Sequence, residues 1–274
     1  MKFSLILATI GRKEEICRLF DSLSKQKYNN FEVILVDQNE PGYLSEVVDK
    51  YASFIDLKHI DSPRGLSVAR NVGLKHASGD IYCFPDDDCW YYPDTLLKVK
   101  ALLKNNSSLF GVTGRCVDEN GYESVAKFGV KDTIIDRTNV FSSAVSITLF
   151  VRKNTIKFNE LIGAGADSIY GSGEETDYVL SLLECGYVLR YSPELVVGHP
   201  NVMTSPSTER AFKYGCGMGY LLRTHNYSVF TVVNWCIKPL LGTIIYAFRL
   251  DFNRSRFYVY TLFGRILGFI NAKN

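Results

Sequence analysis

Apolar and polar positions follow two alternating periods along the first half of the chain. Residues 3–8 and 31–36 are short apolar runs with the length of buried strands, and residues 13–23 between them carry apolar side chains at helical spacing. The same alternation predicts strands at 57–60 and 81–84 and helices at 44–51, 66–77 and 93–103, the last with Pro93 in its first turn. This repeated order predicts an α/β fold with a mainly parallel sheet and helices on both of its faces.

The pattern loosens after residue 108, where strands and loops become harder to separate. We expect a strand at 146–151, a helix from Glu174 to Gly186, and further strands at 187–191 and 195–197. Ser205 and Pro206 are expected to cap a helix that runs to Arg223. Glycine alternates with larger residues at 214–219 of that helix, which predicts close backbone packing rather than a phosphate-binding loop.

The last fifty residues have a different character. Residues 227–248 approach the ~20 apolar residues that span a bilayer, but Lys238 and Pro239 interrupt them near the centre. Residues 257–270 form a second apolar stretch. From residue 201 onward the sequence contains nine Lys or Arg residues but only two Asp or Glu residues. This composition favours amphipathic helices that lie in a membrane interface over two full spans. Buried core helices or oligomer contacts are the alternative interpretation.

The overall composition restricts the class of protein. Of 274 residues, 46% are hydrophobic and 22% are charged, which is typical of a packed chain with one large α/β domain. A net charge of +2 gives no indication of nucleic-acid binding. The seven cysteines are scattered without a C-x-x-C pair, which indicates reduced cytosolic thiols rather than disulfides or a zinc site.

Three consecutive aspartates, Asp86-Asp87-Asp88, directly follow the expected strand at 81–84. A buried strand that ends in acids delivers them to the carboxyl edge of a sheet, where ligands bind in open α/β folds. Adjacent carboxylates repel one another, so a cation or strong hydrogen-bond donors would favour the arrangement. Carboxylate oxygens suit Mg²⁺ or Mn²⁺, and these ions usually bring phosphates with them. An acidic turn or helix cap is the alternative.

Four segments occur in order along the chain: SLILAT at 4–9, VILVD at 33–37, RGLSVARN at 64–71 and SGDIYCFPDDD at 78–88. Together they resemble the family 2 glycosyltransferases, which have a GT-A nucleotide-binding fold. The resemblance covers roughly residues 3–225. It implies a glycosyltransferase domain at 1–225, with a nucleotide-binding half at about 1–108 and an acceptor half at about 109–225. Residues 226–274 then form a basic, apolar helical tail that associates with a membrane.

The resemblance implies donor-binding roles for side chains in these segments. Asp37 would contact the nucleoside, because its carboxylate can accept from an imide N–H and from a ribose hydroxyl. Thr9 would lie against the nucleotide, although a helix N-cap is the other interpretation. Arg70 would face the base or the diphosphate, and Arg64 is a further candidate in the same segment.

The D-x-D pair of the family corresponds to Asp86 and Asp88. The resemblance implies that Asp88 ligates Mn²⁺ or Mg²⁺, while Asp86 contacts the ribose or the metal and its waters. Asp87 between them is a third donor-binding candidate. A histidine after the acidic helix, here His199, would approach the metal or the diphosphate, and imidazole suits Mn²⁺ better than Mg²⁺. A structural role is the alternative for His199.

A second acidic cluster, GSGEETDY at 171–178, resembles the family's acidic motif at the start of a helix. The resemblance makes Glu175 the general base that takes the proton of an acceptor hydroxyl. Because Glu175 stands where the family generally has Asp, Asp177 is the substitute candidate. Acids in a first helical turn also favour the helix dipole. Glu174 and Trp90 are acceptor-binding candidates, with a core role as the alternative for Trp90.

These inferences lead to one expected function. The chain would be an inverting, metal-dependent glycosyltransferase that uses a UDP- or dTDP-sugar and a glycan or lipid-linked glycan acceptor in surface-polysaccharide synthesis. It would be a cytoplasmic protein, peripheral at the inner face of the cell membrane. A sugar-nucleotide pyrophosphorylase is disfavoured because residues 9–13 are not a glycine-rich triphosphate loop. A non-catalytic membrane-associated sugar-binding scaffold is the rival from another class.

Overall fold

The computed structural model describes residues 1–201 and 207–272, which fall into two compact units. The first unit consists of residues 1–64, 68–158 and 178–201. The second consists of residues 65–67 and 159–177 and the described residues after 201. The predicted division at residue 225 follows the order of the chain, whereas these units are interleaved in sequence.

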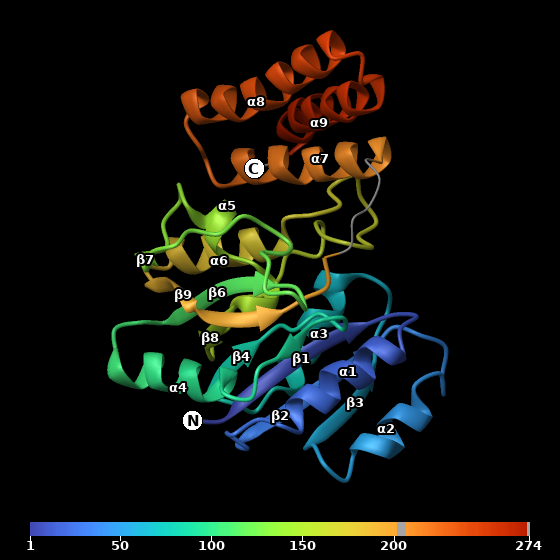
Figure 1. The fold of residues 1–274 in the computed structure, drawn as a ribbon, viewed down its shortest axis with the longest axis vertical. Helices are drawn as coiled ribbons and strands as arrows, with labels where there is room; N and C mark the ends of the chain where they lie inside the picture. Colours follow the sequence, from blue (N-terminus) through green and yellow to red (C-terminus); the bar gives the residue numbers. More distant parts are fainter. Residues whose placement is uncertain (202–206, 273–274) are drawn as a thin grey trace. The chain divides into compact units, whose positions relative to one another are not determined.

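Within the described residues, nine strands form one mixed sheet, and all of them belong to the first unit (Figure 1). Its order is β3-β2-β1-β4-β8-β6-β9-β5, with β7 beside β9. The strands are β1 Phe3–Thr9, β2 Phe31–Asp37, β3 Leu57–Asp61, β4 Ile81–Cys83, β5 Trp90–Tyr91, β6 Gly111–Val117, β7 Thr133–Ile134, β8 Phe150–Arg152 and β9 Leu189–Gly198. The strands from β3 to β4 are parallel, and β8 is antiparallel to both of its neighbours. The predicted α/β fold is therefore confirmed.

The centre of this sheet is buried on both faces. Leu5, Ile6 and Leu7 alternate across β1, and none of them has exposed surface. Gly73 of α3 lies directly against the side chains of Ile6 and Val36, so this helix packs closely on one face. Burial on both faces explains why the parallel strands read as continuous apolar runs. The helices that carry residues of this unit are α1 Glu14–Leu23, α2 Ser45–Tyr51, α3 Leu66–His76, α4 Thr95–Asn105, α5 Val140–Ser143 and α6 Glu174–Glu184.

One predicted helix start is wrong. Pro93 does not lie in the first turn of α4, which begins at Thr95 with Asp94 as its N-cap. The carbonyl oxygen of Pro93 instead accepts a hydrogen bond from the backbone N–H of Lys27 at 2.8 Å. This long-range contact, which has no local sequence signal, keeps Pro93 outside the helix.

The strands after residue 108 also differ from the prediction. Residues 146–148 form a 3₁₀ turn before β8, and the two strands predicted at 187–191 and 195–197 are one strand, β9. Its parallel partner β6 has an irregular register between Thr113 and Arg115, where Gly114 lies against the backbone of Leu195. A bulge of this kind lets a strand continue past a proline, here Pro193.

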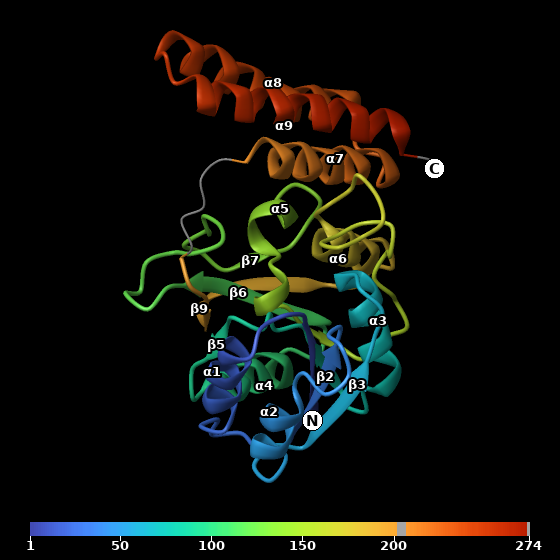
Figure 2. The same ribbon diagram turned by 90° about the vertical axis from the view of Figure 1, so that its right-hand side faces the viewer.

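The second unit contains α7 Thr208–Thr224, α8 Val229–Phe248 and α9 Phe252–Asn271, with α9 between α7 and α8 (Figure 2). The predicted cap at Ser205 and Pro206 lies outside the described residues; Ser207 is the N-cap of α7, and its side chain accepts from the backbone N–H of Arg210. Of the described α8 side chains, that of Pro239 is buried. By length and composition α8 could cross a membrane, and 11% of its apolar window is buried.

Glycines bring the backbones of α7 and α9 into contact. A β-carbon on Gly215 or Gly219 would collide with the backbone of α9, and one on Gly264 or Gly268 would collide with the backbone of α7. This reciprocal spacing of four residues lets two helices approach more closely than larger side chains permit. The close packing predicted for the glycine-rich segment is therefore confirmed.

A further glycine of α7 serves a different neighbour. A β-carbon on Gly217 would collide with the carbonyl oxygen of Ser172, in the loop before α6. Gly173 follows in the left-handed region with φ +98° and packs on Leu221. The acidic turn that begins α6 is thus held against α7 by backbone contacts within the second unit.

Candidate active site

The loop that carries the three aspartates follows β4 in the first unit. Phe84, just before the loop, packs edge-on against Phe158 and Tyr178, with ring centroids 4.9 and 5.6 Å away. Phe158 and Tyr178 stack on each other at 4.4 Å. This buried aromatic cluster fixes the start of the loop and therefore the positions of the carboxylates.

Asp87, the middle aspartate, is buried and hydrogen-bonded. Thr9 Oγ1 donates to its Oδ2 at 2.8 Å, and Arg12 Nη1 lies 2.9 Å from its Oδ1. Burial raises the pKa of Asp87 to about 6, although the bond from Thr9 and the charge of Arg12 act in the opposite direction. The N-cap alternative for Thr9 is wrong, because the N-cap of α1 is Lys13.

Asp88 is held by two basic side chains. Arg12 Nη1 lies 2.5 Å from its Oδ2, and His199 Nε2 lies 3.2 Å from its Oδ1. Burial alone would raise the pKa of Asp88, but His199 and Arg12 lower it to about 2. For His199, burial opposes the charged ring and Asp88 more than compensates, so the pKa of the imidazole is raised. At neutral pH the pair therefore favours an ionised carboxylate.

Asp86 contacts a third basic side chain. Arg70 Nη2 lies 3.2 Å from its Oδ1, and the guanidinium also stacks over the ring of Phe158 at 5.2 Å. Arg70 is 1% exposed, so it holds Asp86 from beneath the surface. Arg64 is exposed at the end of the segment that precedes α3.

The donor set of this loop fits a divalent cation. One ligand atom from each of Asp86, Asp88 and His199 lies within 4.8 Å of the other two. Two carboxylate oxygens and one imidazole nitrogen match the preferences of Mn²⁺, and carboxylate oxygens also bind Mg²⁺. The three residues predicted as metal ligands are therefore brought together, while Asp87 is bonded to Thr9 and Arg12 instead.

Asp37 lies on the strand next to Thr9, because the two are register partners in parallel strands β2 and β1. Its Oδ1 accepts hydrogen bonds from the backbone N–H and the side-chain amide of Asn39, at 2.9 and 2.7 Å. Its Oδ2 lies 2.9 Å from Nε2 of His59 on β3. The carboxylate is thus buried and oriented at the carboxyl edge of the sheet, where a ligand is expected.

The second unit contains the other acidic cluster, in the first turn of α6. Glu175 is half-buried, and Glu174 is buried with its side chain against Gly163. Asp177 is buried, and its Oδ1 lies 2.9 Å from Nε2 of His225 at the end of α7. This contact gives Asp177 a buried partner within the second unit.

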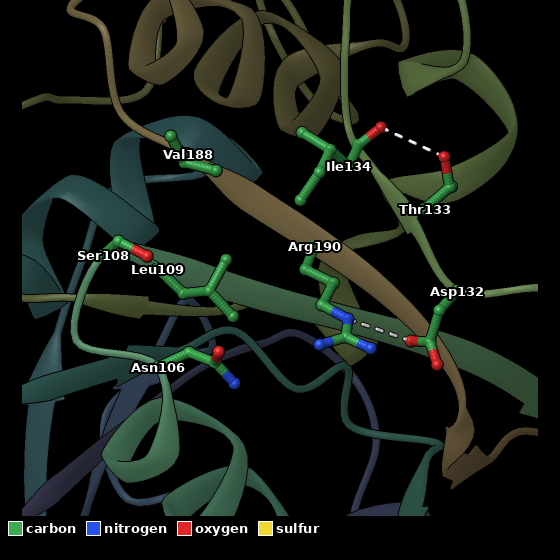
Figure 3. A pocket seen from close by; sticks show the side chains of 8 residues that line it. All are labelled: Asn106, Ser108, Leu109, Asp132, Thr133, Ile134, Val188 and Arg190. Atoms are coloured by element: carbon green, nitrogen blue, oxygen red, sulfur yellow. Dashed lines mark hydrogen bonds and ion pairs between the residues drawn. The ribbon is translucent and has the colours of Figure 1, made fainter.

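Trp90 and the surface pocket both lie in the first unit. The indole covers Gly198 so closely that a β-carbon there would collide with it, and Arg18 stacks on the ring at 5.1 Å. These contacts pack part of the half-buried indole, and its acceptor role stays a prediction. A cavity of about 350 Å³ opens beside β7 and β9, around the 3.1 Å ion pair of Arg190 and Asp132 (Figure 3). None of the predicted site residues is among the described side chains that line it.

Sequence reasoning named Arg70 and His199 as site residues but missed three other basic partners of these acids. Arg12 is separated from Asp87 by 75 residues, His59 from Asp37 by 22 and His225 from Asp177 by 48. The polar loop after the first strand was a weak signal for Arg12. His59 and His225 carried no local signal, because strand register and helix packing bring them to the acids.

Comparisons with known proteins bear on the family and the fold of this chain. The pattern of the family described as "Glycosyl transferase family 2" matches residues 4–158. TarS of Staphylococcus aureus, a poly(ribitol-phosphate) β-N-acetylglucosaminyltransferase, is 27% identical over 184 residues, 62% of this chain and 32% of TarS. Glycosyltransferase AglE of Haloferax volcanii is 24% identical over 253 residues, 87% of this chain and 81% of AglE. This chain therefore spans about a third of the length of TarS.

Solved structures share the fold at low sequence identity. TarS 1–349 in complex with UDP-GlcNAc has a TM-score of 0.59 and 16% identity, covering 97% of this chain and 91% of that one. The mannosyltransferase PcManGT of Pyrobaculum calidifontis, in complex with GDP-Man and Mn²⁺, has a TM-score of 0.63 and 16% identity, covering all of this chain and 88% of that one. Because the family pattern matches more than half of the sequence, this chain belongs to glycosyl transferase family 2.

Proposed function

We propose that this chain is an inverting, metal-dependent glycosyltransferase that moves a sugar from a nucleoside-diphosphate sugar to a hydroxyl of a glycan acceptor. The observation that carries the proposal is the cluster of Asp86, Asp88 and His199, whose ligand atoms lie within 4.8 Å of one another. Asp86 and Asp88 follow β4 and His199 follows β9, in the sheet where Asp37 ends β2. A nucleoside-binding acid and a cation-binding cluster on one sheet match a ligand with a base and a diphosphate.

The donor-binding residues would contact different parts of the nucleotide sugar. Asp37 would accept from the base, while Asp86, Asp88 and His199 would hold Mn²⁺ or Mg²⁺. When bound there, the cation would neutralise charge on the departing diphosphate. Arg70 and Arg12 would keep the carboxylates oriented. The relatives solved with UDP-GlcNAc and with GDP-Man and Mn²⁺ support a nucleotide-sugar donor and a cation of this kind.

The chemical step would be a direct displacement. The acceptor hydroxyl oxygen attacks the anomeric carbon, the bond from that carbon to the diphosphate oxygen breaks, and the diphosphate leaves with the bonding electrons. Glu175 takes the hydroxyl proton, so charge does not accumulate on the attacking oxygen. One displacement inverts the anomeric configuration. Asp177 stays a second candidate for the base, although its buried contact with His225 supports a structural role.

We further propose a membrane surface as a partner, with a lipid-linked glycan as acceptor at the inner face of the cell membrane. The outer surface of α8 is apolar, and Phe230 and Phe248 are 82% and 85% exposed. Arg249 follows α8, and Arg254 and Arg256 lie near the start of α9, where anionic headgroups would attract them. Flotation with vesicles containing phosphatidylglycerol tests this: F230D with F248D should release the protein, whereas Y122D, on an exposed residue elsewhere, should not.

A nucleotide-binding panel tests the catalytic proposal. Thermal shifts with UDP, dTDP, GDP and CMP, each with and without Mn²⁺, should show stabilisation that requires the metal, because a bound ligand stabilises by mass action. Incubation with the matching nucleotide sugar should then release the nucleoside diphosphate. Binding without turnover would favour the sugar-binding scaffold, and consumption of nucleoside triphosphate would favour a pyrophosphorylase.

A further inference from the structure

The carboxylate of Asp37 has almost no free hydrogen-bonding capacity. An ionised carboxylate offers about four acceptor positions. Asn39 occupies both positions on Oδ1, with its backbone N–H at 2.9 Å and its side-chain amide at 2.7 Å. His59 Nε2 occupies one position on Oδ2 at 2.9 Å, and it acts as the donor because the ionised acid has no proton to give. About one acceptor position on Oδ2 therefore remains for a ligand.

Strand register explains why His59 reaches this acid. In the parallel pair β2–β3, Leu35 is the register partner of His59 and Asp37 that of Asp61. Side chains two residues apart share a face of the strand, so the ring of His59 can reach along that face to the next carboxylate. Asp61 belongs to the same group, with one oxygen within 4.8 Å of the ligand atoms of His59 and Asp37.

We propose that His59 is a positioning residue that makes Asp37 selective for a base with one N–H donor between two acceptors, the imide of uracil or thymine. This inference rests on the proposed function, in which Asp37 receives the nucleoside. Guanine presents two adjacent N–H donors, which call for both oxygens of a carboxylate, but Oδ1 is already taken by Asn39. Neutral cytosine and adenine present a ring nitrogen acceptor, which the carboxylate repels. The donor class is then a uridine or thymidine diphosphate sugar.

Removing the imidazole should change selectivity more than it changes affinity. Without His59, the carboxylate is held only through Oδ1 by Asn39 and can turn, so Oδ2 is no longer fixed in the single orientation that favours an imide over guanine. The loss of one oriented hydrogen bond predicts a fall in the UDP-to-GDP preference on the order of fivefold.

The experiment measures dissociation constants of UDP and GDP with Mn²⁺ for the full chain and three variants. Wild type should prefer UDP, H59A should lose on the order of fivefold of that preference, and H59Q, whose amide can still donate, should keep most of it. H76A is the matched control. The side chain of His76 is exposed at the end of α3, and its carbonyl oxygen accepts from Lys58 Nζ at 3.4 Å, a contact that the substitution leaves in place.

Several results would overturn the inference. A wild type that prefers GDP contradicts it directly. So does H59A with an unchanged preference, including one in which both affinities fall together, because that pattern indicates a purely structural role. D37A separates this failure from failure of the proposed function. If D37A binds UDP as wild type does, the nucleoside role of Asp37 is wrong; if D37A loses UDP while H59A keeps the wild-type preference, only the role of His59 is wrong.

Discussion

The two acidic clusters of this chain contain the same kinds of side chain but are stabilised differently. In the first unit, Asp86, Asp87 and Asp88 each contact a basic side chain, supplied by Arg70, Arg12 and His199. In the second unit the acids lie in the first turn of α6, where the helix N-terminus favours negative charge. In the first cluster a basic side chain contacts every carboxylate, whereas in the second the helix N-terminus favours all three acids and His225 contacts Asp177. The proposed function assigns donor binding to the first arrangement and proton transfer to the second.

The largest expected effect is a loss of turnover on substitution of Glu175 in the second cluster. E175Q should lower turnover of the donor sugar by about a thousandfold, because general bases contribute factors of this order. Nucleotide affinity should change by less than about twofold, since binding energy here is proposed to come from the other cluster. Product release and UDP titration measure the two quantities. E209Q, on an exposed acid of α7 in the same unit, is the control, and turnover of E175Q within tenfold of wild type would remove Glu175 as the base.

Asp177 should show the opposite pattern. D177A removes the buried partner of His225 and should lower the free energy of unfolding by about 3 kcal/mol, in the range for breaking a buried pair. The folded variant should keep most of its turnover. Urea unfolding and product release on the same preparation test this. Normal stability together with lost turnover would make Asp177 the base instead.

The first cluster should respond through the cation. D88N removes a proposed metal ligand and should weaken Mn²⁺-dependent UDP binding at least about tenfold. Substitution of residues that only hydrogen-bond to metal ligands already lowers metal affinity by about this factor. Titration of Mn²⁺ at fixed UDP measures the loss. D49N, on an exposed acid of α2, is the control. Equal Mn²⁺ dependence in D88N and wild type would argue against the metal site.

The smallest effect is a pH dependence that is specific to the first cluster. The pKa of Asp87 is about 6 in the folded chain and about 3.9 in an unfolded chain. Protonation of Asp87 therefore stabilises the fold, fully so below pH ~4, and the stabilisation is lost as the pH rises through 6. D87N cannot titrate. Its stability relative to wild type should rise by roughly 1 kcal/mol between pH 5 and pH 7. Urea unfolding in the presence of a metal chelator measures the difference in unfolding free energy between D87N and wild type. If this difference does not vary with pH, the raised pKa of Asp87 is contradicted.

Local pattern predicts the strands and their acids well. Strands β1 and β2 are apolar runs that end in a polar residue, and the apolar run of β4 leads into the three aspartates, so Asp37 and these aspartates could be placed at or just after strand ends from sequence. The region after residue 108 could not be placed as well. Its strands pair in mixed directions, and β9 continues past Pro193 beside the irregular register of β6. The direction and register of such pairing depend on which strand is the partner, and that choice leaves no periodic pattern in the sequence.

The partners of the acids were outside the reach of local pattern. The sequence predicted His199 as a metal ligand, and its ring lies 3.2 Å from Asp88. Arg12, by contrast, is an exposed-looking residue of a polar loop, and its contact with Asp87 joins positions 75 residues apart. Glu175 is located by its place in a motif, and its role stays a prediction. Chemistry-bearing residues are thus easier to predict than the groups that hold them.

The glycine contacts of α7 have a consequence for the modularity of the chain. Gly215 and Gly219 are covered by the backbone of α9, and Gly217 on the same helix supports the loop before Glu175. A deletion of the last fifty residues would therefore strip one side of the helix whose other side carries the acidic turn. The C-terminal segment is an integral part of its compact unit and not a detachable appendage, so its contribution is better dissected by surface substitutions on α8 than by truncation.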